Sequence, residues 1–168
     1  MDSETLRSRQ TPLKDGYRAQ PATALVTLRA EGRLGEGVSC RVETGRALVE
    51  AGLHPATGGS GAQACSGDML LQALVACSGV TLNAVATSLG ITLRDARLRA
   101  EGDLDFRGTL GVAKDAPVGF MQIRLMISLD TDATPEQVQK LLQLTERYCV
   151  VYQTLKSPPV ITVALEGK

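Results

Sequence analysis

The sequence is poor in aromatic residues, with three Tyr, two Phe and no Trp among 168 residues. Proteins that bind single-stranded nucleic acid stack bases on such side chains, so this scarcity argues against that class. Neither sign of charge prevails, because 18 Lys and Arg balance 18 Asp and Glu. No large electrostatic field therefore favours a nucleic-acid or membrane partner.

Metal-ligand patterns are also missing. The only histidine is His54, and no C-x-x-C pair occurs, so the spacing of a zinc site is absent. A catalytic Cys–His pair would need His54 beside a thiol, but His54-Pro55 is typical of a junction between a strand and a loop. We therefore expect no metal and no bound cofactor.

The chain begins with MDSETLRSRQTPLKDG, which has no apolar core of a signal peptide, so we expect a cytoplasmic protein. The longest apolar stretch, residues 69–86, contains Gln72, Ser78 and Asn83, which a lipid-facing span tolerates poorly. In the cytosol thiols stay reduced unless they are catalytic, sensing or metal-bound. The four cysteines are therefore candidates for reactivity; they are Cys40, Cys65, Cys77 and Cys149.

The hydrophobic pattern predicts an α+β fold. Residues 1–22 show no periodicity and are expected to form a disordered or loosely ordered arm, and residues 23–168 a single domain. We expect strands at 24–30, 38–42, 47–51, 97–107, 121–129 and 160–166, a Gly-rich turn at 31–37 and a loop at 54–67. Strands with helices packed on one face are typical of α+β domains, and much of the pattern predicts antiparallel sheet.

Two helices are predicted. The first spans residues 68–89, ends at Gly90 and is apolar almost all round, so it should be buried in a core or between subunits. The second begins at Thr134-Pro135-Glu136-Gln137, which combines a Thr N-cap, Pro at the first helical position and the Gln of a capping box. It should continue to the region of Cys149.

Cys77 and Cys149 each lie on the apolar face of a predicted helix. Two helices on one sheet can bring such thiols within disulfide reach, which needs Cα atoms about 4.4–6.8 Å apart, but the sequence does not show that they meet. Cysteine is also among the most buried residue types, so simple core packing is the alternative. For Cys40, on the apolar face of a strand, packing is the favoured interpretation, and Cys65 lies in a loop without an assigned role.

The segment GDMLLQALVACSGVTLNAVATSLGI, followed by GDLDFRGTLG and ERYCVVYQTL, resembles the osmotically inducible protein C (OsmC) and organic hydroperoxide resistance (Ohr) superfamily. The resemblance extends over residues 24–165. It implies an OsmC-like fold, in which an intertwined homodimer has antiparallel sheets around long, centrally buried helices. Catalytic members of this superfamily reduce organic hydroperoxides with two cysteines and an external thiol or lipoyl reductant.

The resemblance also assigns roles to residues. It makes Cys77 the peroxidatic thiol and Cys149 the resolving thiol, with an arginine from the N-terminal hairpin, Arg33 or next Arg46, beside Cys77. The superfamily's carboxylate falls on Gly67 here, and the nearest acid, Asp68, is nine residues before Cys77. The superfamily usually has Pro after the second thiol, where this chain has Val150.

Asp68 lies on the side of a straight helix opposite Cys77, because nine residues advance it by about 100° each. It can serve Cys77 only through a non-helical entry or across a dimer.

A thiolate attacks a peroxide bond, and a neighbouring guanidinium favours the thiolate in an apolar pocket. The sequence therefore predicts a thiol peroxidase for organic, including lipid, hydroperoxides. The alternative is a non-enzymatic protein of the same fold that binds a small apolar ligand or senses oxidation.

Overall fold

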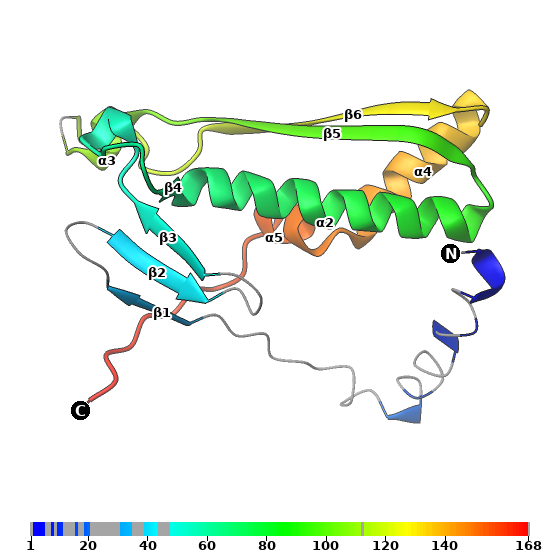
Figure 1. Cartoon of the computed structure of the whole chain (residues 1–168), viewed down its shortest axis with the longest axis horizontal. Coiled ribbons are helices and arrows are strands. Elements are labelled where there is room, and N and C mark those ends of the chain that lie inside the picture. The colour runs from blue at the N-terminus through cyan, green and yellow to red at the C-terminus, as the bar shows by residue number, and fades with distance from the viewer. Residues whose placement is uncertain are drawn as a thin grey trace.

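The structure is a computed structural model (Figure 1). It describes residues 49–111 and 113–167 in full, the backbone of 31–34, 39–43 and 48, and isolated positions between 2 and 20. The predicted strand 24–30, Arg46 and the side chains of Arg33 and Cys40 lie outside this description.

The first sheet has the strand order β1-β2-β3-β4. Its strands are β1 (Glu31–Leu34), β2 (Ser39–Glu43), β3 (Leu48–Gly52) and β4 (Ala64–Cys65). The first three pair antiparallel, whereas the short β4 pairs parallel with β3. The predicted turn at 31–37 is wrong in its first half, because Glu31–Leu34 already pairs with β2 as a strand.

The second sheet is a long antiparallel ribbon of β5 (Leu93–Asp103) and β6 (Gln122–Thr131), which runs along α2 (Figure 1). The prediction of two neighbouring strands is confirmed, but the first was placed too late in the chain. Residues 106–109 form the short helix α3 (Phe106–Thr109) instead. The reason is local, since the Asp105 side chain accepts a hydrogen bond from the Arg107 N–H and caps the turn.

The helix α2 (Ser66–Leu89) confirms the first predicted helix, and Gly90 ends it in the left-handed conformation at φ 68°. Four residues at a spacing of four form its buried stripe: Leu74, Ser78, Leu82 and Ala86. Leu82 and Ala86 of this stripe pack with Ile91 and with Leu141 of α4 (Pro135–Tyr148) to form the core.

Much of the rest of α2 is exposed within one chain, so burial of this helix on most sides, predicted for a core or between subunits, stays a prediction. Val80, for example, is 73% exposed. By length and composition α2 is the one helix in the described part of the chain that would be able to cross a membrane, a test that core helices also pass.

The C-terminal part differs from the prediction at two places. The capping box of Thr134 and Gln137 is confirmed, but the predicted second helix is two helices, α4 and α5 (Val150–Lys156), with only Cys149 between them. The predicted last strand, 160–166, has no ladder partner in the described part of the chain. It leaves the domain as an extended tail in which Val163 is 96% exposed, because no strand edge among the described residues receives it.

Candidate thiol site

Two of the predicted site residues lie together in the structure. Cys77 comes from the middle of α2, and Cys149 is the single residue that joins α4 to α5. Their side chains are in hydrogen-bond contact, although they are 72 positions apart in the sequence and both thiols are free. The packing of α4 and α5 on α2 therefore brings the two sulfurs to one place.

Cys149 is fully buried, with 0% of its surface exposed. Its Sγ lies 3.3 Å from the Oγ of Ser78 and accepts a hydrogen bond from the Tyr152 N–H at 3.5 Å. Its own N–H donates to the carbonyl of Thr145 at 2.9 Å, so the residue ends α4 and caps α5 at once. The Cys149 sulfur is consequently held by contacts from α2 and α5, and its backbone by α4.

Cys77 is only partly buried and has the more reactive environment. Burial by itself raises the pKa of its thiol, but hydrogen bonds oppose this effect. They come from the Val151 N–H, the Cys149 side chain, the Val150 N–H and the Thr81 side chain, in decreasing order, and the net result is a lowered pKa. A lowered pKa increases the fraction of thiolate, which is the nucleophilic form.

Val150 stands where the superfamily usually has proline, and this difference has a structural consequence. The Val150 N–H is one of the donors that reach the Cys77 sulfur. Proline has no N–H, so a proline at this position would remove that donor. Valine at 150 keeps this N–H, which helps to lower the pKa of the Cys77 thiol.

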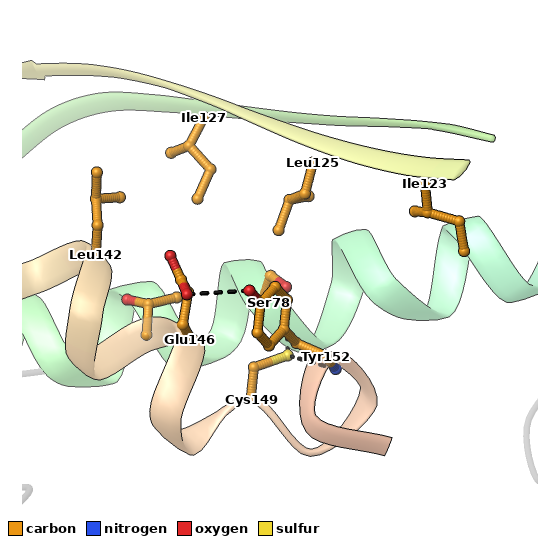
Figure 2. A pocket seen from close by; sticks show the side chains of 9 residues that line it. Ser78, Ile123, Leu125, Ile127, Leu142, Glu146, Cys149 and Tyr152 are labelled. Atoms are coloured by element: carbon orange, nitrogen blue, oxygen red, sulfur yellow. Dashed lines mark hydrogen bonds between the residues drawn. The ribbon is translucent and has the colours of Figure 1, made fainter. Parts of the chain in front are cut away.

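A cavity of about 350 Å³ adjoins the Cys149 side of the site. Figure 2 shows Ile123, Leu125 and Ile127 pointing from β6 toward the helices that carry Cys149 and Tyr152. The Tyr152 hydroxyl, which donates to Glu146 Oε2 at 3.0 Å, lies on its wall together with the hydroxyls of Ser78 and Thr145. The cavity suits an apolar molecule better than a small polar one.

In the structure, Asp68 does not lie beside Cys77 of the same chain. The helix already begins at Ser66, so the non-helical entry that would turn Asp68 toward Cys77 is absent. Nine residues at about 1.5 Å each separate the two by roughly 13 Å along the axis. Asp68 instead lines a different cavity, of about 360 Å³, together with His54 and Cys65.

The predicted arginine stays a prediction. Arg33 lies on β1, where its backbone pairs with that of Arg41, and nothing in the described residues places its side chain relative to Cys77. Within the described part of the chain no group of three or more His, Cys, Asp or Glu residues is arranged to hold a metal ion.

Sequence reasoning missed the polar groups around the two sulfurs. For Ser78 a signal was present, because it falls in the four-residue spacing of Leu74, Leu82 and Ala86 and is therefore on the buried stripe. The N–H donors of Val150 and Val151 had no such signal, because they depend on the break between α4 and α5.

The arrangement of two thiols on packed helices can be compared with known proteins. The family model described as OsmC-like protein matches residues 59–164, which is more than half of the chain. The chain belongs to the OsmC-like protein family. The matched region of this OsmC-like chain includes α2, both sheet strands of the β5–β6 ribbon, α4, α5 and both thiols of the site.

Solved structures share the fold at low sequence identity. An OsmC-like protein from Mycoplasma pneumoniae has a TM-score of 0.67 at 16% identity, over 79% of this chain and 89% of that one. An organic hydroperoxide resistance protein from Elizabethkingia anophelis gives 0.64 at 18% identity, over 80% and 91%. The organic hydroperoxide resistance protein OhrB of Bacillus subtilis gives 0.53 at 19% identity, over 79% and 93%. No curated protein matches the sequence.

Proposed function

We propose that this OsmC-like protein is a thiol-dependent peroxidase that reduces organic hydroperoxides, with Cys77 as the attacking thiol and Cys149 as the resolving thiol. The observation that carries the proposal is the pairing of a partly exposed thiol of lowered pKa with a fully buried second thiol. The names of the structurally similar hydroperoxide resistance proteins agree with it.

The reaction follows from the difference between the two thiols. The Cys77 thiolate attacks the outer oxygen of the hydroperoxide, an S–O bond forms, the O–O bond breaks, and the departing alkoxide takes a proton to become the alcohol. Cys149 then attacks the Cys77 sulfenic acid, so that an S–S bond forms, the S–O bond breaks and water leaves. An external dithiol, of which a lipoyl group is one kind, reduces the disulfide by exchange.

Part of this proposal is a second copy of the chain. Val80 on α2 is 73% exposed and Leu165 of the extended tail 99% exposed, so apolar side chains stay uncovered and the tail has no ladder partner among the described residues. A homodimer would cover them and would allow Arg33 or Asp68 to reach the thiols of the other copy. The sedimentation mass of the protein tests this part, and a monomeric mass would contradict it. We place the protein in the cytosol, where a reducing dithiol is available.

The decisive experiment is turnover of cumene hydroperoxide with dithiothreitol or dihydrolipoamide as the reductant. We expect Cys77→Ser to lower the rate by several orders of magnitude, because the nucleophile is lost. Cys149→Ser should still react once and accumulate a Cys77 sulfenic acid, detectable with dimedone. Cys65→Ser is the matched control and should keep the wild-type rate. Turnover that survives Cys77→Ser would contradict the mechanism.

A second candidate is a non-enzymatic role, binding a small apolar ligand or sensing oxidation. The apolar cavity beside Cys149 favours it, as does the distance between Asp68 and Cys77 within one chain. This candidate predicts a stable oxidised form of Cys77 without turnover in the same assay. It also predicts saturable binding of a fluorescent apolar probe that Leu125→Glu abolishes.

A further inference from the structure

Ser78 is a polar residue in the most apolar part of the molecule. It is 1% exposed, and the other members of its stripe on α2 are Leu74, Leu82 and Ala86. Burying a hydroxyl without a hydrogen bond destabilises the fold, so such a residue needs a partner. Its partner from outside α2 is the Sγ of Cys149, at 3.3 Å. The one buried serine of this stripe is therefore directed at the second thiol of the site.

We propose that Ser78 is a positioning residue for Cys149, an inference that rests on the proposed peroxidase function and adds a role to it. Cys77 and Ser78 are successive residues, so their side chains leave α2 about 100° apart. The Cys149 sulfur contacts both of them. Ser78 thus holds that sulfur against α2, next to the atom with which it must form a bond.

The resolving step explains why this position matters. After Cys77 has become a sulfenic acid, the Cys149 sulfur must approach the Cys77 sulfur opposite the departing oxygen. The S–S bond forms as the S–O bond breaks, and the proton of the Cys149 thiol leaves with the oxygen as water. A sulfur that is held in place reacts faster than one that must first find the orientation, because the entropic cost of ordering has been met in the folded state.

The same contact limits damage. A sulfenic acid that is not resolved reacts with a second hydroperoxide to give a sulfinic acid, which an external dithiol does not reduce. The fate of Cys77 is therefore a competition between Cys149 and the next hydroperoxide molecule. Ser78 favours Cys149 in this competition, because it keeps the Cys149 sulfur close to Cys77.

The neighbouring cavity wall provides a matched control. Thr145 is 2% exposed and lines the same cavity, but its hydroxyl donates to the Leu141 carbonyl at 2.8 Å, a bond within α4. Thr145→Val therefore removes a buried hydroxyl from the same region without removing a partner of Cys149. A purely structural role for buried hydroxyls would affect both sites alike.

The test compares hydroxyl-free and hydroxyl-bearing side chains at position 78. Ser78→Ala and Ser78→Val remove the hydroxyl, whereas Ser78→Thr, which has the shape of Val, retains it. In single-turnover reactions with cumene hydroperoxide, dimedone labelling measures sulfenic acid and non-reducing mass spectrometry measures disulfide and sulfinic acid. We expect sulfenic acid to form at the wild-type rate in every variant. Disulfide formation should be about tenfold slower in Ser78→Ala and Ser78→Val than in the wild type, a factor that corresponds to the loss of one hydrogen bond.

We also expect Ser78→Thr and Thr145→Val to retain the wild-type rate of disulfide formation, and the Ala and Val variants to accumulate more sulfinic acid. Ser78→Ala and Ser78→Val remove the hydroxyl independently of each other. Since alanine favours helix, we expect at least Ser78→Ala to fold and to serve for the comparison. Wild-type resolution in either folded variant would overturn the inference, as would equal slowing by Thr145→Val.

A second oxidant separates this inference from the proposed function. Diamide takes two electrons and two protons from a pair of thiols and becomes a hydrazine, so it forms the disulfide without a hydroperoxide. If the wild-type protein does not react with hydroperoxide, the peroxidase proposal fails. Slower diamide oxidation in Ser78→Ala and Ser78→Val would then still support the positioning role, and an unchanged rate would overturn it.

Discussion

Two cysteines of this chain stand at the N-cap of a helix, and they differ in almost every other respect. Cys65 precedes α2, makes no capping hydrogen bond with its side chain and is partly exposed. Cys149 precedes α5, accepts a hydrogen bond from the Tyr152 N–H and is fully buried. The same residue type in the same local position therefore gives two very different thiols.

The difference comes from the elements that surround each cysteine. Three helices, α2, α4 and α5, meet around Cys149 and bring it a second thiol and the Ser78 hydroxyl. Near Cys65 the cavity contains Asp68 and His54, but the ring of His54 stacks on Phe106 with centroids 5.0 Å apart, and its Nδ1 accepts from the Ala56 N–H. A thiol site thus depends on convergence of elements that are distant in the sequence, and a helix terminus alone does not provide it.

The comparison of the two cysteines predicts that packing around Cys149 contributes much more to stability than packing around Cys65. Leu141 is 0% exposed and belongs to the core that holds α4, and therefore Cys149, against α2. We expect Leu141→Ala to lower the free energy of unfolding by about 2–5 kcal/mol and to slow disulfide formation. Leu70, near Asp68, is 38% exposed, and Leu70→Ala should cost much less. Urea denaturation measures the free energy of unfolding of both variants. Equal losses in Leu141→Ala and Leu70→Ala would contradict this difference between the two regions.

A smaller effect is expected from removing one of the backbone N–H groups that lower the pKa of Cys77. Val150→Pro removes one N–H from the Cys77 sulfur, and proline is well tolerated at the first position of a helix. The preceding residue, Cys149, already has the extended conformation (φ −73°, ψ 109°) that proline requires of it. Folding should therefore be retained while the pKa of Cys77 rises.

The sign of the pH effect follows from this rise. The wild-type reaction rate with iodoacetamide follows the thiolate fraction, so the lowered pKa of Cys77 places the midpoint of its pH profile below that of an ordinary thiol. In Val150→Pro the midpoint should move upward, so the rate below the midpoint should fall by roughly two- to tenfold. Val150→Ala retains the N–H and is the control. An unchanged midpoint in Val150→Pro would show that this donor does not act on the thiolate.

The smallest effect is expected at the Cys65 cap. Since its side chain makes no capping bond, Cys65→Ala should change the free energy of unfolding by less than about 0.5 kcal/mol. Thr134 is the comparator, because its side chain accepts from the Gln137 N–H at 3.3 Å within a complete capping box. Thr134→Ala should cost about 1 kcal/mol in the same urea titration. A loss of that size at Cys65 would reveal a structural role for its thiol.

Local signals explain which parts of the fold were predictable. The end of α2 at Gly90 and the capping box at Thr134 depend on residues within one turn, so the sequence pattern identifies them. The charged and apolar alternation of the β5–β6 ribbon also predicts strands correctly. The break between α4 and α5 has no breaker residue, and it arises where Cys149 takes an extended conformation between two helices.

The candidate site was predictable only in part for the same reason. The four-residue stripe of α2 locates Ser78 on the buried face, but nothing in the spacing of Cys77 and Cys149 requires their side chains to meet. Their association was implied by the resemblance to the OsmC and Ohr superfamily and depends on long-range packing. The exposed tail also shows the limit of local patterns, because alternating apolar residues predict an extended strand at 160–166 but do not supply its partner.

The single-residue junction at Cys149 determines how the sulfur is able to move. Its N–H is bonded to the Thr145 carbonyl and its carbonyl accepts from the Gln153 N–H, each at 2.9 Å, so the backbone on both sides is fixed by a helix. The soft degree of freedom that remains is the torsion about the Cα–Cβ bond. In the proposed redox cycle, the bond between the sulfurs would then close and open by a turn of this side chain, while the backbone on both sides keeps its hydrogen bonds.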